Sequence, residues 1–571
     1  MKKNALLLTA IIFLAVFFRF NNLNWDQGFH LHPDERFLTM VGNAMKLNGV
    51  KNYLDPSQST LNPTNIGFKF FVYGSFPIVF NKITAVFLGN DNYNSFTIQG
   101  RALSAIFDLF TLIFVFKLVE LFEKKIKIAS SIKYWSVFLY AIAVLPIQLA
   151  HFFAVDTFLT FFMMASFYFA FKYYFDFKRP NLLISGIFLG LALACKVSAI
   201  YIIPLLAILI FFALINDRKR NVVHKIISLF IYGLVVYLIL RLANPYYFET
   251  VNILDPTPNK LFMLNIRSLE NFNDKNGFYP PGIQWISKNN FFALINLAFF
   301  GLGLPYFFML IFGIILIIIK IIKTTKKKVN ENLLFGVILI WVLGFFIYQS
   351  TQFVKAMRYF IFLYPFFAIF AAFGIDWFFS LIKIEFNPKK AISYWPLAIS
   401  LILLLIWPLS FSSIYLTKNS RVRASEWIYK NFPNSSYLLN ESWDDPLPLL
   451  MENNEGKIFQ GEMIGVFDPD SQEKWRKLNE AFKKSDYYIL SSNRAWGSIS
   501  TVPDKYPLMS KFYKDLFAGK LQYQKVREFT SYPEFKILNF KFQIDDSWAD
   551  ETFTVYDHPK VIIFKNEEKC K

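Results

Sequence analysis

The sequence NALLLTAIIFLAVFFRF occupies residues 4–20 and is followed, after a short polar stretch, by FHLHPDERF at residues 29–37. A helix that crosses a bilayer needs about 20 mostly apolar residues, and the chain of 571 residues, 55% hydrophobic, holds about eleven such runs before residue 415. No small-residue cleavage site follows the first run, so we expect a retained span. The sequence predicts a polytopic α-helical membrane protein with about eleven transmembrane helices, at 4–20, 98–122, 134–150, 156–175, 181–195, 199–215, 226–242, 291–319, 332–349, 358–374 and 394–414.

The net charge of +19 comes from the membrane-spanning part of the chain. From residue 415 onward, 23 Lys and Arg balance 23 Asp and Glu. The basic excess lies mostly in alternate loops between predicted spans, which the positive-inside rule places in the cytoplasm. This orientation predicts a multi-pass plasma-membrane protein with a cytoplasmic N-terminus and with residues 21–97, 243–290 and 415–571 outside. The charge therefore indicates topology, and no nucleic-acid partner is expected.

The chain divides into a membrane domain at 1–414 and an extracytoplasmic α/β domain at 415–571. In the first outer loop, 21–97, two amphipathic segments at 34–47 and 68–88 are typical of helices that lie at the membrane interface. The second outer loop, 243–290, is rich in Asn, Pro and aromatic residues and has no helical period. In the outer domain, alternating patterns predict strands at 436–440, 486–490 and 560–564 and helices at 421–432 and 471–485.

Asp34 and Glu35 lie just beyond the first predicted span, on its outer side. Because they follow Pro33, they suit the first turn of a helix, where negative charge complements the helix dipole. A carboxylate that is fixed in this way can also act as a general base toward the attacking hydroxyl of an acceptor in glycosyl transfer. The two roles are compatible, and the sequence leaves both open.

Two histidines precede these carboxylates. His30 and His32 could form a divalent-cation site with Asp34, since imidazole and carboxylate bind zinc or manganese. No HExxH spacing accompanies them, and polar surface histidines explain the pattern more simply. Metal use stays open, and no cofactor is otherwise expected.

Several charged residues stand at the outer ends of predicted spans. Asp156 begins one span, and an ionisable group at that depth suggests function, although a residue at the interface is the simpler interpretation. Lys196 is the only charge in its hairpin, where it either snorkels or binds phosphate. Lys355 and Arg358 could hold a lipid phosphate, which Arg can bind through two hydrogen bonds. Arg101 is a weaker candidate for the same role.

Several nucleotide and hydrolase signatures are missing. The sequence contains no Walker A motif, no Rossmann glycine pattern and no G-x-S-x-G. A cytoplasmic nucleotide sugar is therefore an unsuitable donor for a site that faces outward.

Four stretches of the membrane part carry a resemblance to a known family. They are GRALSAIFDLFTLIFVF (100–116), HFFAVDTFLTFFMMASF (151–167), GLALACKVSAIYIIPLL (190–206) and KAMRYFIFLYPFFAIFAAFGI (355–375). Together with the outer Asp-Glu pair, they resemble the polyprenyl-phosphate-sugar-dependent glycosyltransferases of the protein O-mannosyltransferase and aminoarabinose transferase type, which have the GT-C fold. The tail, for example SDYYILSSNRAWGSI (485–499), resembles the outer domain of a prokaryotic subgroup of that family.

The resemblance implies an inverting single displacement from a polyprenyl-phosphate sugar. It implies that Asp34 is the base, that Glu35 positions donor or acceptor, and that Asp156 is the second acidic position. His32 would lie near the acceptor or a metal. Lys196 and Arg358, with Lys355 and Arg101 as further candidates, would lie near the donor phosphate. The partners implied are a polyprenyl-phosphate-linked sugar, the bilayer, and an acceptor glycan, lipid or protein.

Two alternatives remain at this level. A transporter or flippase of lipid-linked intermediates would carry mid-span charges and broken helices in two related halves, and the sequence has few of the former and no repeat. An oligosaccharyltransferase or ligase of the same fold would carry a WWD-type motif, to which Trp443, Asp444 and Asp445 have only a passing likeness.

Overall fold

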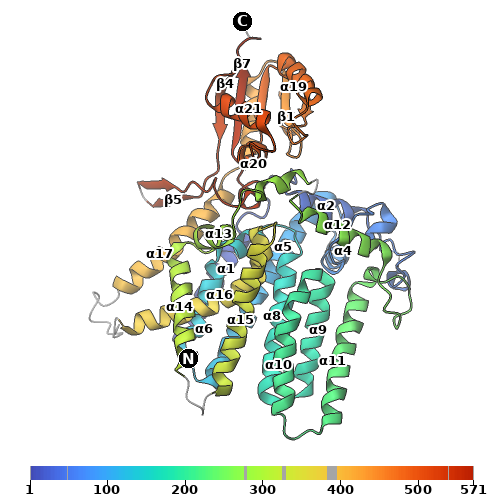
Figure 1. The fold of residues 1–571 in the computed structure, drawn as a ribbon, viewed down its shortest axis with the longest axis vertical. Helices are drawn as coiled ribbons and strands as arrows, with labels where there is room; N and C mark the ends of the chain where they lie inside the picture. The colour runs from blue at the N-terminus through green and yellow to red at the C-terminus, as the bar shows by residue number, and fades with distance from the viewer. Residues whose placement is uncertain are drawn as a thin grey trace.

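The computed structural model describes residues 2–47, 49–275, 279–323, 329–381, 395–537 and 539–569. The chain forms a large helical part, drawn below, and a smaller part with a β-sheet, drawn above it (Figure 1). The boundary falls between α17, which ends at Ser412, and α18, which begins at Ser420. Parts of two predicted cytoplasmic loops, 324–328 and 382–394, lie outside the described residues.

The helical part follows the predicted apolar runs. It contains α1 Lys2–Phe20, α2 Pro33–Ala44, α3 Val50–Tyr53, α4 Phe76–Leu88, α5 Tyr93–Ile126, α6 Ser131–Ile142, α7 Val144–Ala150, α8 Asp156–Asp176, α9 Arg179–Cys195, α10 Ile203–Asn216, α11 Val222–Ala243, α12 Lys260–Phe272, α13 Phe292–Asn296, α14 Leu304–Ile322, α15 Val329–Thr351, α16 Tyr364–Leu381 and α17 Trp395–Ser412. The multi-pass helical prediction is confirmed.

The predicted number of spans is not confirmed. Within the described residues, seven helices are long and apolar enough to cross a membrane, or eight if the bent pair α6 and α7 counts as one span. That pair replaces the single predicted run 134–150 and bends by 54°. Pro146 explains the bend, because a proline ring clashes with the carbonyl four residues earlier, here that of Ile142.

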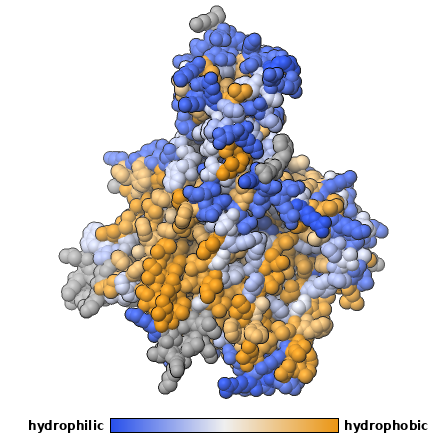
Figure 2. All heavy atoms as spheres, in the orientation of Figure 1, coloured by the Kyte–Doolittle hydropathy of each residue, from blue (hydrophilic) through white to orange (hydrophobic). Residues whose placement is uncertain are grey.

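The surface polarity fits a protein that crosses a bilayer. Hydrophobic side chains cover the flanks of the helical part, and hydrophilic ones cover the sheet-containing part above and the lowest turns (Figure 2). Phe308 and Ile315 of α14 and Phe230 of α11 are exposed on these flanks. The N-terminal end of α1 lies at the lower side, opposite the outer domain (Figure 1). This arrangement supports the predicted orientation, which remains a prediction.

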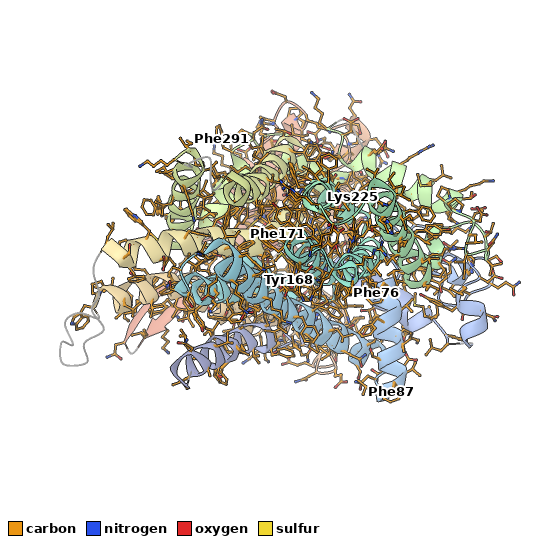
Figure 3. The ribbon with its side chains drawn as sticks, turned by 90° about the horizontal axis from the view of Figure 1, so that it is seen from below. Phe76, Phe87, Tyr168, Phe171, Lys225 and Phe291 are labelled. Atoms are coloured by element: carbon orange, nitrogen blue, oxygen red, sulfur yellow. The ribbon has the colours of Figure 1, made fainter. Side chains whose placement is uncertain are left out.

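Both helices predicted in the first outer loop are present, and a further amphipathic helix was not predicted. α2 and α4 occupy most of 34–47 and the second half of 68–88. On α4, Phe87 is 88% exposed and points away from the molecule, whereas Phe171 of α8 lies buried among the helices (Figure 3). The expectation that 243–290 lacks helical structure is wrong, because α12 there is an amphipathic helix of 13 residues capped by Asn259.

The outer domain is a mixed sheet between two helical layers. Its five strands are ordered β2-β1-β3-β7-β4, with β1 parallel to β2 and β3, and β7 antiparallel to β3 and β4. The elements are α18 Ser420–Asn431, β1 Tyr437–Glu441, β2 Gln460–Ile464, α19 Gln472–Lys484, β3 Tyr487–Leu490, α20 Arg494–Ile499, α21 Pro507–Phe517, β4 Tyr523–Phe529, β5 Glu534–Ile537, β6 Phe540–Gln543, α22 Glu551–Thr554 and β7 Val561–Asn566. All three predicted strands and both predicted helices are confirmed.

Alternation along β3 explains the two layers. Ile489 packs with Ile428 of α18, whereas Tyr488 and Leu490 pack in the cluster that includes Leu478 of α19. Successive side chains of a strand point to opposite faces, so each face of the sheet receives its own apolar cover. Because β1 and β3 are parallel neighbours, their carboxyl ends lie at the same edge of the sheet.

Candidate active site

A cavity of about 810 Å³ lies where membrane helices, outer loops and the outer domain meet. Spanning segments give it an apolar wall that includes Leu159, Phe345 and Phe362. Ten charged side chains line the remainder, and their signs balance: Asp34, Asp156, Asp444, Asp445, Glu551, Arg36, Lys196, Arg358, Arg421 and Arg494. A lipid-linked polar group could thus enter with its chain on apolar surface and its head among charges.

Asp34 lies in the first turn of α2 and lines the cavity. Pro33 occupies the first helical turn, and the His32 ring caps the helix by accepting the Glu35 N–H at 3.2 Å. The Asp34 carboxylate accepts a hydrogen bond from the Arg358 guanidinium. Burial would raise the pKa of Asp34, but the charges of Arg358 and of His32 when protonated lower it to about 2. Asp34 is therefore ionised at neutral pH.

Arg358 is the second residue of a short 3₁₀ helix, Met357–Leu363, and brings a cation to Asp34 across 324 positions of sequence. Among the described residues, its Nε is a buried donor without a hydrogen-bond partner. Arg358 therefore keeps donors for a further acceptor in the cavity.

Lys196 and Asp156 form a second charged pair on the same cavity. The Lys196 Nζ lies 2.8 Å from Asp156 Oδ1 and 5.5 Å from the centre of the Tyr359 ring. Asp156 is the first residue of α8, and Lys196 follows the last residue of α9. The two helix ends thus hold the pair beside Arg358, the neighbour of Tyr359.

Glu35 and Arg101 lie behind the cavity wall and do not line it. All five N–H donors of Arg101 are used, by Glu35, by Asp26 and by the Leu23 carbonyl. Glu35 also accepts the Phe153 N–H at 2.7 Å. Arg101 therefore has no free donor for a phosphate, which argues against the predicted role. The position of Glu35 suits holding α2 in place rather than contacting substrate.

Lys355 and the two histidines also lie off the cavity. Lys355 is 5% exposed, and its Nζ donates to the Gln352 carbonyl at 2.6 Å, so it does not serve as predicted at a phosphate. His32 packs between the rings of Phe152 and Tyr556. Both ring nitrogens of His30 are engaged, by Asn94 and Thr97. Across the described ranges, no group of three or more His, Cys, Asp or Glu is arranged to hold a metal ion.

The outer domain supplies further charged residues. Asp444 and Asp445 were noted in the sequence only for their likeness to a WWD motif, and Arg421 and Arg494 were not singled out. Asp444 and Asp445 follow β1, and Arg494 follows β3, so all three stand at the carboxyl edge of the sheet, where α/β sheets bind ligands. Arg421 binds both aspartates, and Arg36 of α2 reaches Asp445 at 2.8 Å. The signal was available, since the polar run SSNR directly follows one predicted strand and SWDD follows another after one intervening residue.

Comparisons with known proteins bear on the fold. Residues 80–246 match the model of the dolichyl-phosphate-mannose-protein mannosyltransferase family. The oligosaccharyltransferase AglB from Archaeoglobus fulgidus, in complex with an inhibitory peptide and a dolichol-phosphate, is similar with a TM-score of 0.50 at 13% identity, over 95% of this chain and 74% of that one. The chain has the GT-C fold.

Two further solved structures are also similar to the chain. The Archaeoglobus fulgidus oligosaccharyltransferase in complex with Zn and sulfate gives a TM-score of 0.50 at 14% identity, covering 89% and 71% of the two chains. ArnT from Cupriavidus metallidurans, bound to undecaprenyl phosphate, gives 0.40 at 12%, covering 94% and 97%. No curated protein matches the sequence. The family match includes Asp156 and Lys196 but neither Asp34 nor Arg358, whose roles rest on the cavity's geometry.

Proposed function

We propose that this GT-C protein is a glycosyltransferase that moves a single sugar from a polyprenyl-phosphate carrier to an acceptor hydroxyl on the outer face of the membrane. One observation carries the proposal. The ionised Asp34 and the incompletely bonded Arg358 stand together in a cavity with an apolar wall on the membrane side and the outer domain on the other. Such a site suits a polar reaction on a substrate delivered by lipid.

The proposed reaction is an inverting single displacement. The acceptor oxygen forms a bond to the anomeric carbon while the bond from that carbon to the phosphate oxygen breaks. The leaving phosphate keeps the electron pair, and Arg358 and Lys196 stabilise its charge. Asp34 takes the proton of the attacking hydroxyl. The Arg358 contact makes Asp34 a weak base in the resting state. Asp34 becomes a stronger base when the arginine turns away from it toward the phosphate.

In this proposal Asp156 orients Lys196, and Glu35 with Arg101 fixes the α2 turn from behind. The outer domain closes the acceptor side of the cavity through Asp445, Arg494 and Trp443. The acceptor, whether glycan, lipid or protein, then approaches between α2 and the carboxyl edge of the sheet.

Transfer of a preassembled oligosaccharide is the second candidate. The AglB likeness concerns the fold, and a cavity of about 810 Å³ has room for more than one sugar. The mass added to the acceptor separates the two reactions, because a single-sugar transferase adds one residue in each turnover.

The decisive experiment follows transfer from a polyprenyl-phosphate sugar by protein in lipid nanodiscs, with membrane extracts of a deletion strain as acceptor and mass spectrometry of the product. We expect Asp34→Asn to abolish transfer while the protein stays folded and inserted. Asp504→Asn, an exposed position of the outer domain that does not line the cavity, serves as the matched control. Full transfer by the Asp34→Asn protein would overturn the base assignment.

A further inference from the structure

A second, smaller pocket of about 210 Å³ adjoins the main cavity, and Tyr73 lines both. Its walls come from the first outer loop, from the segment after α11 and from the N-terminal half of α12. None of the residues assigned to the reaction above lines it.

The partition between the two spaces is built by alternation. In the extended segment before α4, Phe70 and Val72 line the main cavity, whereas Phe71 lines the second pocket, as expected when successive side chains point to opposite sides. α12 is divided along its length instead: Phe262, in its first half, lines the pocket, and Leu269, in its second half, lines the cavity. A substrate at Tyr73 can therefore touch both spaces.

The chemistry of the pocket differs from that of the cavity. Glu249 is the one charged residue in its lining as the structure describes it, and no Lys or Arg is present there. A phosphate or another anion is therefore a poor ligand. The polar lining includes the amides of Asn62, Asn65, Asn244, Asn259 and Asn265 and the hydroxyls of several Ser, Thr and Tyr residues, groups that donate and accept hydrogen bonds. Asn62, Asn65 and Asn265 donate to backbone carbonyls of the protein. Such a lining matches a polyhydroxyl ligand.

Two polar atoms of this lining lack a protein partner within the part of the chain that the structure describes. They are Asn244 Nδ2 and the Tyr247 hydroxyl. Asn244 is 1% exposed, and its Oδ1 accepts from Ser75 at 2.6 Å, which fixes the amide and leaves the NH₂ unused. The Tyr247 ring stacks on Phe262 with centroids 4.0 Å apart. A buried polar group without a partner is costly, so these two atoms point to a missing ligand.

We infer that this pocket binds one uncharged sugar ring, held by Asn244 and Tyr247 and adjoining the reaction site through Tyr73. A volume of about 210 Å³ suits a single ring rather than a longer glycan. The inference rests on the proposed function in one respect: the ring belongs to a substrate, either as the donor's sugar or as a unit of the acceptor next to the attacking hydroxyl.

The test is saturation-transfer difference NMR with the full chain in lipid nanodiscs, free of sugar-headed detergent, using D-mannose and D-glucose as probes. We expect a signal from at least one neutral sugar and no signal from glucuronate. Inorganic phosphate should not displace the neutral sugar. Tyr247→Phe removes only an unpartnered hydroxyl and should raise Kd about 2- to 10-fold, the worth of one hydrogen bond. Ser57→Trp, an exposed position at the pocket, should fill it and abolish binding.

The matched control is Tyr306→Phe, which removes another buried unpartnered hydroxyl, in α14, away from both spaces. Absence of neutral-sugar binding, or binding unchanged by either pocket variant, overturns the inference. If a polyprenyl-phosphate sugar displaces mannose and bare polyprenyl phosphate does not, the pocket binds the sugar of the donor. If neither displaces mannose, the pocket binds a unit of the acceptor. Asp34→Asn should leave sugar binding intact, so failure of the proposed reaction and failure of this site are distinguishable.

Discussion

Two arginines of this protein illustrate how burial decides what a side chain can do. Arg101 is 0% exposed and uses every donor on Asp26, Glu35 and one carbonyl. Arg358 lines the cavity and binds Asp34, and within the described residues its buried Nε has no hydrogen-bond partner. The first therefore stabilises the fold, and the second is equipped to meet a ligand.

For Arg358 we expect Arg358→Gln to lower kcat/KM about 100-fold or more, the scale seen when one donor to a developing negative charge is removed. The pKa of Asp34 should rise because its neighbouring cation is gone, so the acid limb of the pH–rate profile should move to higher pH. Lys355→Gln, three residues earlier and off the cavity, should leave kcat/KM within a few-fold of the wild type. Equal losses of kcat/KM in the Arg358→Gln and Lys355→Gln proteins would contradict the assignment of Arg358 rather than Lys355 to the donor phosphate.

For Arg101 we expect Arg101→Gln to act on stability. It leaves two buried carboxylates, Asp26 and Glu35, without their cation, and breaking a buried pair in this way costs about 3–5 kcal/mol. The thermal unfolding temperature in nanodiscs should fall, together with the yield of inserted protein. A stable Arg101→Gln protein with impaired donor binding would instead support the phosphate role that the structure argues against.

At the scale of elements, the strand ends of the outer domain supply the polar wall of the cavity. Glu441, the last residue of β1, is buried and accepts hydrogen bonds from the hydroxyls of Tyr488 and Tyr513. Burial raises the pKa of Glu441 to about 7, although the two tyrosine bonds oppose the rise. The sheet next to the cavity thus contains a carboxyl group that titrates near neutrality.

The consequence is a pH-dependent stability of this sheet. A carboxyl whose pKa is higher in the folded state than in the unfolded state, where it is about 4.5, binds its proton more tightly when folded. The stabilisation is complete below pH 4.5 and is lost as pH rises through 7, by roughly 3 kcal/mol at most. Hydrogen exchange of β1 amides between pH 5 and 8, corrected for intrinsic rates, should show this loss, and Glu441→Gln should remove it. Exchange rates of the wild-type β1 amides that do not change with pH after this correction would contradict the prediction.

The elements themselves were largely predictable from sequence, whereas their pairings were not. β1, β3, β7, α18 and α19 follow local alternation and helical periods, which are short-range signals. The amphipathic pattern of α12 was present too, but the surrounding Asn and Pro residues concealed it. Asp34 was identified from its place after a span; its partner Arg358 is 324 positions away, and no spacing rule connects them. The burial that consumes Arg101 likewise depends on contacts among distant elements.

At the scale of the whole molecule, a charged network docks the outer domain onto the membrane helices. His558 lies between Asp546 at 2.9 Å and Asp557 at 2.5 Å, all three buried. Asp557 also binds Gln148 of α7 and the Tyr415 hydroxyl, while Phe553 of α22 packs in the membrane core. The His558–Asp557 pair therefore has two roles: its opposite charges compensate each other, and Asp557 attaches the outer domain to α7.

Burial would lower the pKa of His558, but the two carboxylates raise it to about 10. A histidine with a raised pKa stabilises the folded arrangement fully below about pH 6.5, and that stabilisation is lost as pH rises through 10, when the two carboxylates lose their cation. We expect spin labels at Asp504→Cys and Phe87→Cys, with Cys570→Ser, to give a narrow distance distribution at pH 7.5 and a broad one near pH 10. His558→Gln should broaden it already at pH 7.5 and lower transfer, because the acceptor wall moves away from Asp34. Narrow distributions in both proteins at both pH values would show that the remaining contacts, such as the packing of Phe553 and the Arg36–Asp445 pair, hold the domain in place without a charged His558.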